Sequence, residues 1–156
     1  MAEPKQYKVF LSKAMALSAS REMCSSDIKK KLEVWGMDEL QSESIIDQLK
    51  SEKFIDDSRF ASAFVKDKFR YNKWGKMKIT AHLRMKNIAS DIISQSLDTI
   101  DQETYYESIR TIIVAHKKSV RAKNPYDLKA KLLRYGLSKG FESNILYDVI
   151  NSIEPE

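Results

Sequence analysis

Residues 73–88, KWGKMKITAHLRMKNI, contain the spacing on which the fold prediction rests. Ile79 and Leu83 are four residues apart, and Asn87 and Ile88 follow after a further turn. An apolar pair at this spacing forms one stripe of a helix, and Asn can adopt the left-handed conformation that ends a helix. The stretch therefore predicts a short helix with a stop built into its sequence.

The same pattern occurs roughly fifty residues to either side of this stretch. The upstream copy is Ile28, Leu32, Gly36 and Met37, and the downstream copy is Leu128, Leu132, Gly136 and Leu137. Each copy precedes a second segment with apolar residues at helical spacing. These segments contain Ile45, Ile46 and Leu49; Ile92, Ile93 and Leu97; and Ile145, Leu146, Val149 and Ile150.

Helix starts are predicted upstream of each copy, where an apolar residue directly precedes a good N-cap residue. The three pairs are Leu11-Ser12, Ile55-Asp56 and Ile100-Asp101. We interpret Asp56 as an N-cap, Asp57 as favourable to the helix dipole and Arg59 as a local partner, rather than as a catalytic or magnesium-binding carboxylate pair. Asn124-Pro125, an N-cap residue followed by an N1 proline, opens the middle helix of the third unit.

These patterns predict an all-α fold of three tandem three-helix repeats, which a chain with four glycines and three prolines favours. The repeats should span residues 11–55, 56–100 and 101–153, with frayed ends at 1–10 and at the final Glu-Pro-Glu. A unit of this size buries its apolar stripe only partly, so neighbouring units should pack in series into an elongated molecule that can curve.

Composition argues against several classes of function. Cys24 is the only cysteine, and His82 and His116 are far apart in the sequence, so neither a metal site nor a covalent nucleophile is expected. No glycine-rich phosphate loop is present, so we expect no cofactor and no enzymatic activity. The absence of a long apolar run predicts a protein of the cytoplasm with no membrane partner, and the repeats favour a monomer.

The formal net charge of +5 is concentrated in the second and third units. Residues 66–86 and 117–139 each hold eight Lys or Arg against one acid, interleaved with Tyr71, Trp74, Tyr126 and Tyr135. Such segments can contact phosphates and bases, although basic residues also form the ordinary solvated face of a helix. The candidate binding residues are Lys66, Lys68, Arg70, Lys73, Lys76, Lys78, Arg84 and Lys86, with Lys117, Lys118, Arg121, Lys123, Lys129, Lys131 and Arg134 as a second set.

FIDDSRFASAFV (54–65) and KWGKMKITAHLRMKNI (73–88) resemble the second repeat of the RecX family of bacterial recombinase regulators. ALSASREMCSSDIKKKLEVWGM (16–37) is similar to that family's first repeat, while Lys86-Asn87-Ile88 departs from its usual Lys-Gly-Ile. The resemblance implies a non-enzymatic protein of DNA repair, recombination and the SOS response. Such a protein binds RecA recombinase filaments on single-stranded DNA and restrains their ATP hydrolysis and strand exchange.

Two other interpretations remain open. The helices around Lys-Asn-Ile-Ala-Ser could form a helix-turn-helix, or bind DNA without sequence preference, although the would-be recognition helix at 90–97 lacks Arg and Lys. A purely structural helical scaffold would predict no effect on a recombinase and only weak, salt-sensitive DNA retention.

Overall fold

The computed structural model describes residues 4–153, which form nine α-helices and contain no strand. The prediction of an all-α fold is therefore confirmed for this part of the chain. The helices are α1 Pro4–Ser20, α2 Ser25–Val34, α3 Glu39–Ser51, α4 Asp57–Arg70, α5 Lys76–Met85, α6 Ser90–Leu97, α7 Gln102–Lys117, α8 Pro125–Ser138 and α9 Ser143–Ser152.

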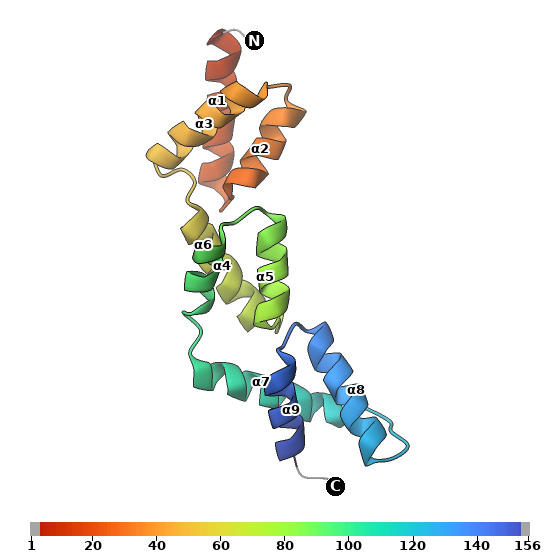
Figure 1. Ribbon diagram of the computed structural model, residues 1–156. Coiled ribbons are helices and arrows are strands. Elements are labelled where there is room, and N and C mark those ends of the chain that lie inside the picture. Colours follow the sequence, from red (N-terminus) through yellow and green to blue (C-terminus); the bar gives the residue numbers. More distant parts are fainter. Residues whose placement is uncertain (1–3, 154–156) are drawn as a thin grey trace.

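The helices group in threes, and each helix packs against both other members of its triplet. The first repeat is α1–α3, the second α4–α6 and the third α7–α9, and each has its own cluster of buried apolar side chains. Figure 1 shows the three repeats arranged one after another, with the two ends of the chain at opposite ends of the molecule. The predicted elongated series of three-helix repeats is thus confirmed.

The apolar stripes of the middle helices form the centres of these clusters. Ile28 and Leu32 of α2 are fully buried, as are Ile79 and Leu83 of α5. Leu132 of α8 retains only 2% of its accessible surface. Burial of such a side chain stabilises the fold by about 1.5–3 kcal/mol. Because residues at i and i+4 lie on the same face of a helix, this spacing marks the face that each middle helix buries.

Two of the three predicted helix stops are confirmed. Gly36 and Asn87 follow α2 and α5 with φ of 92° and 59°. The prediction for Gly136 is wrong, because α8 continues to Ser138 and Gly140 adopts the positive φ instead. Gly136 serves close packing: a Cβ there would lie 2.3 Å from a methyl group of Leu146 in α9.

The predicted caps of the later helices are confirmed. Asp56, Asp101 and Asn124 each accept a hydrogen bond from a backbone amide in the first turn of the helix that follows. The predicted start of the first helix at Ser12 is wrong, as is the frayed segment over 4–10, because α1 begins at Pro4. Residues 1–3 and the final Glu-Pro-Glu lie outside the described residues.

The early start of α1 has a packing explanation. Tyr7, Phe10, Leu11 and Ala14 recur at spacings of three and four, and all pack into the core of the first repeat. The ring of Phe10 stacks on Trp35 with centroids 6.1 Å apart. The apolar stripe therefore extends one full turn before the expected N-cap.

The middle helices meet end to end along one side of the molecule (Figure 1). The hydroxyl of Ser26, in the first turn of α2, donates to the carbonyl of Lys86 at the end of α5 (2.6 Å). At the next junction the amide of Gly75, directly before α5, donates to the carbonyl of Lys139 at the end of α8 (2.7 Å). Donors at the start of one middle helix thus satisfy carbonyls at the end of the middle helix in the next repeat.

Candidate functional site

The first inter-repeat junction is built mainly from side chains at the start of α2. Asp57 of α4 accepts hydrogen bonds from the backbone amide of Ser25 (2.9 Å) and from its hydroxyl (3.1 Å). Asp27 pairs with the ammonium group of Lys86 at 2.8 Å. Burial raises the pKa of Asp27, but hydrogen bonds from Lys86 and Cys24 outweigh it, so the pKa lies below its ordinary value of 3.8.

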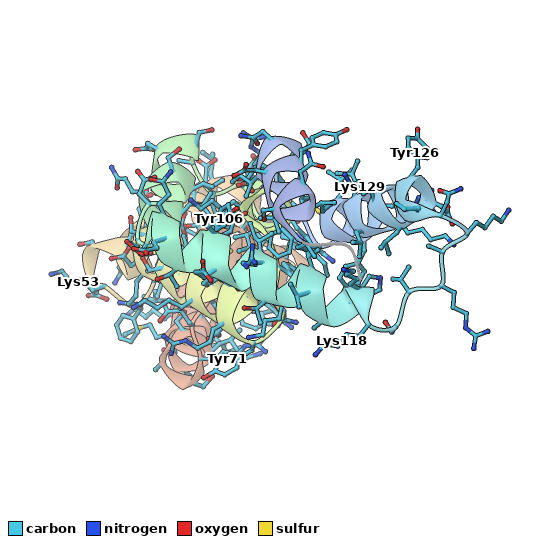
Figure 2. All side chains as sticks on the ribbon, turned by 90° about the horizontal axis from the view of Figure 1, so that it is seen from below. Lys53, Tyr71, Tyr106, Lys118, Tyr126 and Lys129 are labelled. Atoms are coloured by element: carbon cyan, nitrogen blue, oxygen red, sulfur yellow. The ribbon has the colours of Figure 1, made fainter. Side chains whose placement is uncertain are left out.

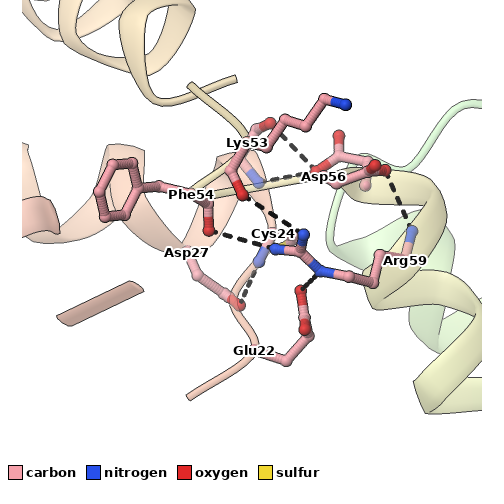
Figure 3. A network of polar contacts seen from close by, with 9 residues as sticks. Glu22, Cys24, Asp27, Lys53, Phe54, Asp56 and Arg59 are labelled. Carbon is pink, nitrogen blue, oxygen red and sulfur yellow. Dashed lines mark hydrogen bonds and ion pairs between the residues drawn. The ribbon is translucent and has the colours of Figure 1, made fainter. Parts of the chain in front are cut away.

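Arg59 fixes the same junction from the other side (Figure 3). Its Nε donates to Glu22 at 2.8 Å, and its two terminal nitrogens donate to the carbonyls of Lys53 and Phe54 at 3.3 and 3.2 Å. The local partnership expected with the neighbouring aspartates is therefore replaced by contacts with the first repeat and the linker. The rigid guanidinium fork suits this three-way contact.

The second junction is made largely by backbone. The amide of Met77 donates to the carbonyl of Gly140 at 3.0 Å. Gly75 and Gly140 lie so close that a Cβ on Gly75 would be 2.3 Å from the carbonyl carbon of Gly140. Such contact is possible only for glycine, so these two residues fix how the third repeat meets the second.

Tyr105 of α7 completes the second junction. Its hydroxyl accepts a hydrogen bond from the amide of Lys76 (3.0 Å) and donates a short one to the carboxylate of Glu142. Burial and the bond to Glu142 raise the pKa of Tyr105, so the hydroxyl stays protonated. Tyr105 is only 2% exposed, and the centroid of its ring lies 5.8 Å from that of Phe69. Polar and apolar contacts therefore join the second and third repeats at one residue.

The predicted basic residues of the second repeat fall into separate groups. Lys66, Arg70 and Lys73 line a groove of about 420 Å³ between the second and third repeats, opposite the hydroxyl-bearing Thr104 and Ser108. Lys68, only two residues from Lys66, lines a different groove, because neighbours two apart point about 200° apart around a helix.

A second group of cations lies around the ring of Trp74. The ammonium groups of Lys68 and Lys78 lie 5.0 and 4.7 Å from its ring centroid, and the ring of His82 packs 4.5 Å away. The distances fit cation–π contacts, which hold these lysines in place without neutralising them. Burial, and after it the charge of Lys78, lowers the pKa of Lys139.

The remaining predicted residues of the second repeat have distinct surroundings. Lys76 lies over the ring of Tyr105 at 4.7 Å, and Lys86 is held by Asp27 in the first junction. Arg84 is exposed on α5. Lys76 and Lys86 are therefore candidate contact residues that also have a structural role, whereas the side chain of Arg84 is exposed to solvent.

The predicted residues of the third repeat do not form one face. Tyr126 and Lys129 project to one side of the repeat and Lys118 to the other (Figure 2). Lys131 is engaged by Asp127 at 3.2 Å and by the carbonyl of Arg121. Lys117 ends α7, Lys123 lies in the following loop, and Arg134 is exposed on α8. The candidate residues of this second set are thus distributed over several surfaces.

Sequence reasoning missed three exposed cations of the first repeat: Arg21, Lys30 and Lys31. They line the same inter-repeat groove as Lys68 and Lys86 of the second repeat. Three consecutive lysines at 29–31 are too short a run to predict a nucleic-acid site, and residues 1–65 hold ten Lys or Arg against eleven acids. Only the contact between repeats brings these residues together.

Little in the described residues suggests catalytic chemistry. Across positions 4–153, no three His, Cys, Asp or Glu side chains lie close enough to hold a metal ion. Cys24 is buried in the core of the second repeat, and burial raises the pKa of its thiol. No helix in this range is long and apolar enough to cross a membrane. The notable surface features are basic grooves between repeats.

Comparison with known proteins gives consistent matches. A family model described as RecX, second three-helix domain, matches residues 56–97, which include α4–α6. The chain is 38% identical over 127 residues to regulatory protein RecX of Clostridium botulinum (strain Eklund 17B / Type B), covering 79% of this chain and 58% of that protein. It is 29% identical over 157 residues to regulatory protein RecX of Clostridium beijerinckii, covering 98% of this chain and 72% of that protein.

Two solved structures share the fold. A crystal structure of regulatory protein RecX superimposes with a TM-score of 0.86 at 24% identity, covering 95% of this chain and 72% of that one. The crystal structure of RecX from Lactobacillus salivarius superimposes with a TM-score of 0.84 at 19% identity, covering 96% of this chain and 97% of that one. The chain spans 58% of the length of the Clostridium botulinum protein.

Proposed function

The chain belongs to the RecX family, and from this premise we propose that it is a regulatory protein that binds RecA filaments on single-stranded DNA. Its proposed effect is inhibition of the recombinase's ATP hydrolysis and strand exchange in DNA repair and recombination. It acts as a monomer in the cytoplasm and is not itself an enzyme, so ATP is a cofactor of the partner.

One observation carries the proposal: basic clusters recur along a rod whose repeats are joined by specific contacts. Lys66 and Arg70 lie at the second junction, Lys68 and Lys86 at the first, and Arg134 on the third repeat. A rod with cations at fixed intervals can contact several subunits or phosphates of a filament at once. Simultaneous contacts of this kind would hinder growth or rearrangement of the filament.

The helix-turn-helix alternative is not favoured by the packing. Its recognition helix would be α6, which packs against α4, buries Ile93 and Ser96 and contains no Lys or Arg. Phosphate clamps and base contacts commonly use those residue types. Non-specific binding of DNA remains compatible with the basic grooves, and it is separated from filament regulation by experiment.

The deciding experiment is a titration of ATP hydrolysis by the cognate recombinase on single-stranded DNA at near-physiological salt. Inhibition at protein concentrations well below those that coat the free DNA is the expected result. Binding of the protein to the same DNA is measured in parallel by anisotropy. DNA binding without an effect on hydrolysis would contradict filament regulation and favour the non-specific DNA-binding alternative.

A further inference from the structure

A groove of about 500 Å³ opens between the first and second repeats. One wall comes from the first repeat and includes Arg21, Lys30 and Lys31. The other comes from the second and includes Lys68 and Lys86. The groove exists only because the two repeats meet, so its occupant contacts both of them.

The charges of this groove are unequally satisfied. Two of its three carboxylates are paired: Glu22 with Arg59 at 2.8 Å and Asp27 with Lys86 at 2.8 Å. Among residues 4–153, none forms an ion pair with Arg21, Lys30 or Lys31, and all three are exposed. The groove thus holds five cations and three carboxylates, the third being Asp67, and its three cations from the first repeat form no ion pair with any described residue.

Aromatic rings lie beneath these charges. Phe60 and Phe64 line the groove with their ring centroids 5.9 Å apart and their planes at 26°. The ammonium groups of Lys86 and Lys68 lie 5.5 and 5.4 Å from these two rings. Phe60 is buried and Phe64 half-buried, so the groove offers cations together with one partly accessible aromatic ring, which suits a ligand that combines phosphate with planar bases.

We propose that this inter-repeat groove binds the phosphodiester backbone of single-stranded nucleic acid. The proposal rests on the proposed function and names a DNA-contacting site within it, one that includes the first repeat. Arg21, Lys30 and Lys31 pair with phosphates from one wall, and Lys68 contributes from the other. A phosphate near Lys86 competes with Asp27 for that ammonium group, so occupancy of the groove is coupled to the first junction.

The test compares two double charge reversals in the full chain. Lys30→Glu/Lys31→Glu alters the groove, whereas Lys8→Glu/Lys50→Glu alters two exposed lysines of the same repeat outside it. Binding of a fluorescein-labelled oligo-dT is measured by anisotropy at several salt concentrations, and circular dichroism verifies the helicity of both variants.

The groove variant should bind oligo-dT about 10-fold more weakly than the control variant at low salt, with a salt slope shallower by about 1.4 because two phosphate contacts are lost. Equal affinity and slope in the two variants would overturn the proposal. The equal change in net charge removes long-range attraction as an explanation of any difference.

Crosslinking gives a second measurement that does not depend on affinity. A thiol-linked photocrosslinker is attached to Lys31→Cys or to Lys50→Cys, while native Cys24 is fully buried. The proposal predicts covalent capture of oligo-dT from position 31 and not from position 50. Equal capture from both positions, or none from position 31, would contradict it.

The recombinase assay separates the two levels of inference. If the groove variant binds oligo-dT normally but no longer inhibits ATP hydrolysis, the groove contacts protein and this proposal is wrong while filament regulation stands. If the unaltered protein has no effect on hydrolysis and the groove variant still loses oligo-dT, the groove assignment stands and the proposed function is wrong.

Discussion

Asp57, the first residue of α4, accepts hydrogen bonds from both the amide and the hydroxyl of Ser25, the first residue of α2. One carboxylate therefore lies at the start of two helices that belong to different repeats. The residue before α2 is Cys24, whose thiol is a weak acceptor. The start of α2 thus combines its own capping contact, in which Asp27 accepts from the amide of Cys24, with a side chain supplied by the second repeat.

Replacement of Asp57 by Ala should destabilise the protein by about 1–2 kcal/mol, because it removes two hydrogen bonds at a helix start. Asp56→Ala, which removes the cap of α4 alone, is the matched comparison at about 1 kcal/mol. Urea denaturation measures both losses. Hydrogen exchange should then show faster exchange at the start of α2 only for Asp57→Ala, and unchanged exchange there would contradict the cross-repeat cap.

Arg59→Lys should lose most of what Arg59→Ala loses, about 1 kcal/mol, since the interaction is partly exposed. Lysine keeps the charge but cannot reach Glu22 and the carbonyls of Lys53 and Phe54 at once. Unfolding free energies of the two variants and of Glu22→Gln form the test. Wild-type stability in the Arg59→Lys variant would show that charge alone matters at this junction.

Gly140→Ala and Gly36→Ala form a pair with the same backbone conformation, because both glycines have φ of 92°. A Cβ at Gly36 meets nothing within 4 Å, so this change should cost about 1 kcal/mol of backbone strain. A Cβ at Gly140 would lie 2.3 Å from that of Lys78, which adds a clash and raises the cost to about 2–5 kcal/mol. Similar thermal midpoints would contradict the close contact between repeats.

Periodicity along the chain predicted most of the fold, because helix stripes and caps depend on residues a few positions apart. Ile28, Leu32, Ile79 and Leu83 were predicted in this way and are fully buried. The glycine at 136 was misassigned because glycine can either end a helix or let another helix approach. Only the position of Leu146 distinguishes the two roles.

The candidate surface was less predictable, since it depends on how repeats meet. Ser25 and Asp57 are 32 residues apart in the sequence. Lys139, whose ammonium group donates to the carbonyl of Asn72, is 67 residues from it. No local pattern contains such pairs. The basic segments were identified by composition, but their division between grooves follows from the helix face on which each lysine lies.

Charge reversal at the exposed residues Lys66, Arg70 and Arg84 should weaken filament binding while leaving helicity unchanged. Reversal at Lys76 and Lys78 should also weaken binding, but it disturbs ammonium groups that lie over Tyr105 and Trp74. Co-sedimentation with recombinase filaments measures binding, and circular dichroism measures helicity. Unchanged co-sedimentation of the folded exposed-residue variant would exclude this part of the surface.

The ion pair of Asp27 and Lys86 should make the first junction sensitive to acid. Because the pKa of Asp27 is lowered in the folded protein, its stabilising contribution is fully present above the ordinary value of 3.8. That contribution is lost as the pH falls through 3.8 toward the folded pKa.

Asp27→Asn keeps the shape of the side chain but cannot titrate, so it isolates this effect from other acids with lowered pKa values such as Asp101 and Asp127. The difference in unfolding free energy between wild type and Asp27→Asn should be largest near about pH 6 and shrink toward about pH 3. Urea unfolding across this interval provides the measurement. A difference that stays constant with pH would mean that the Asp27 carboxylate is not stabilised by folding, and that Lys86 does not hold the two repeats together through its charge.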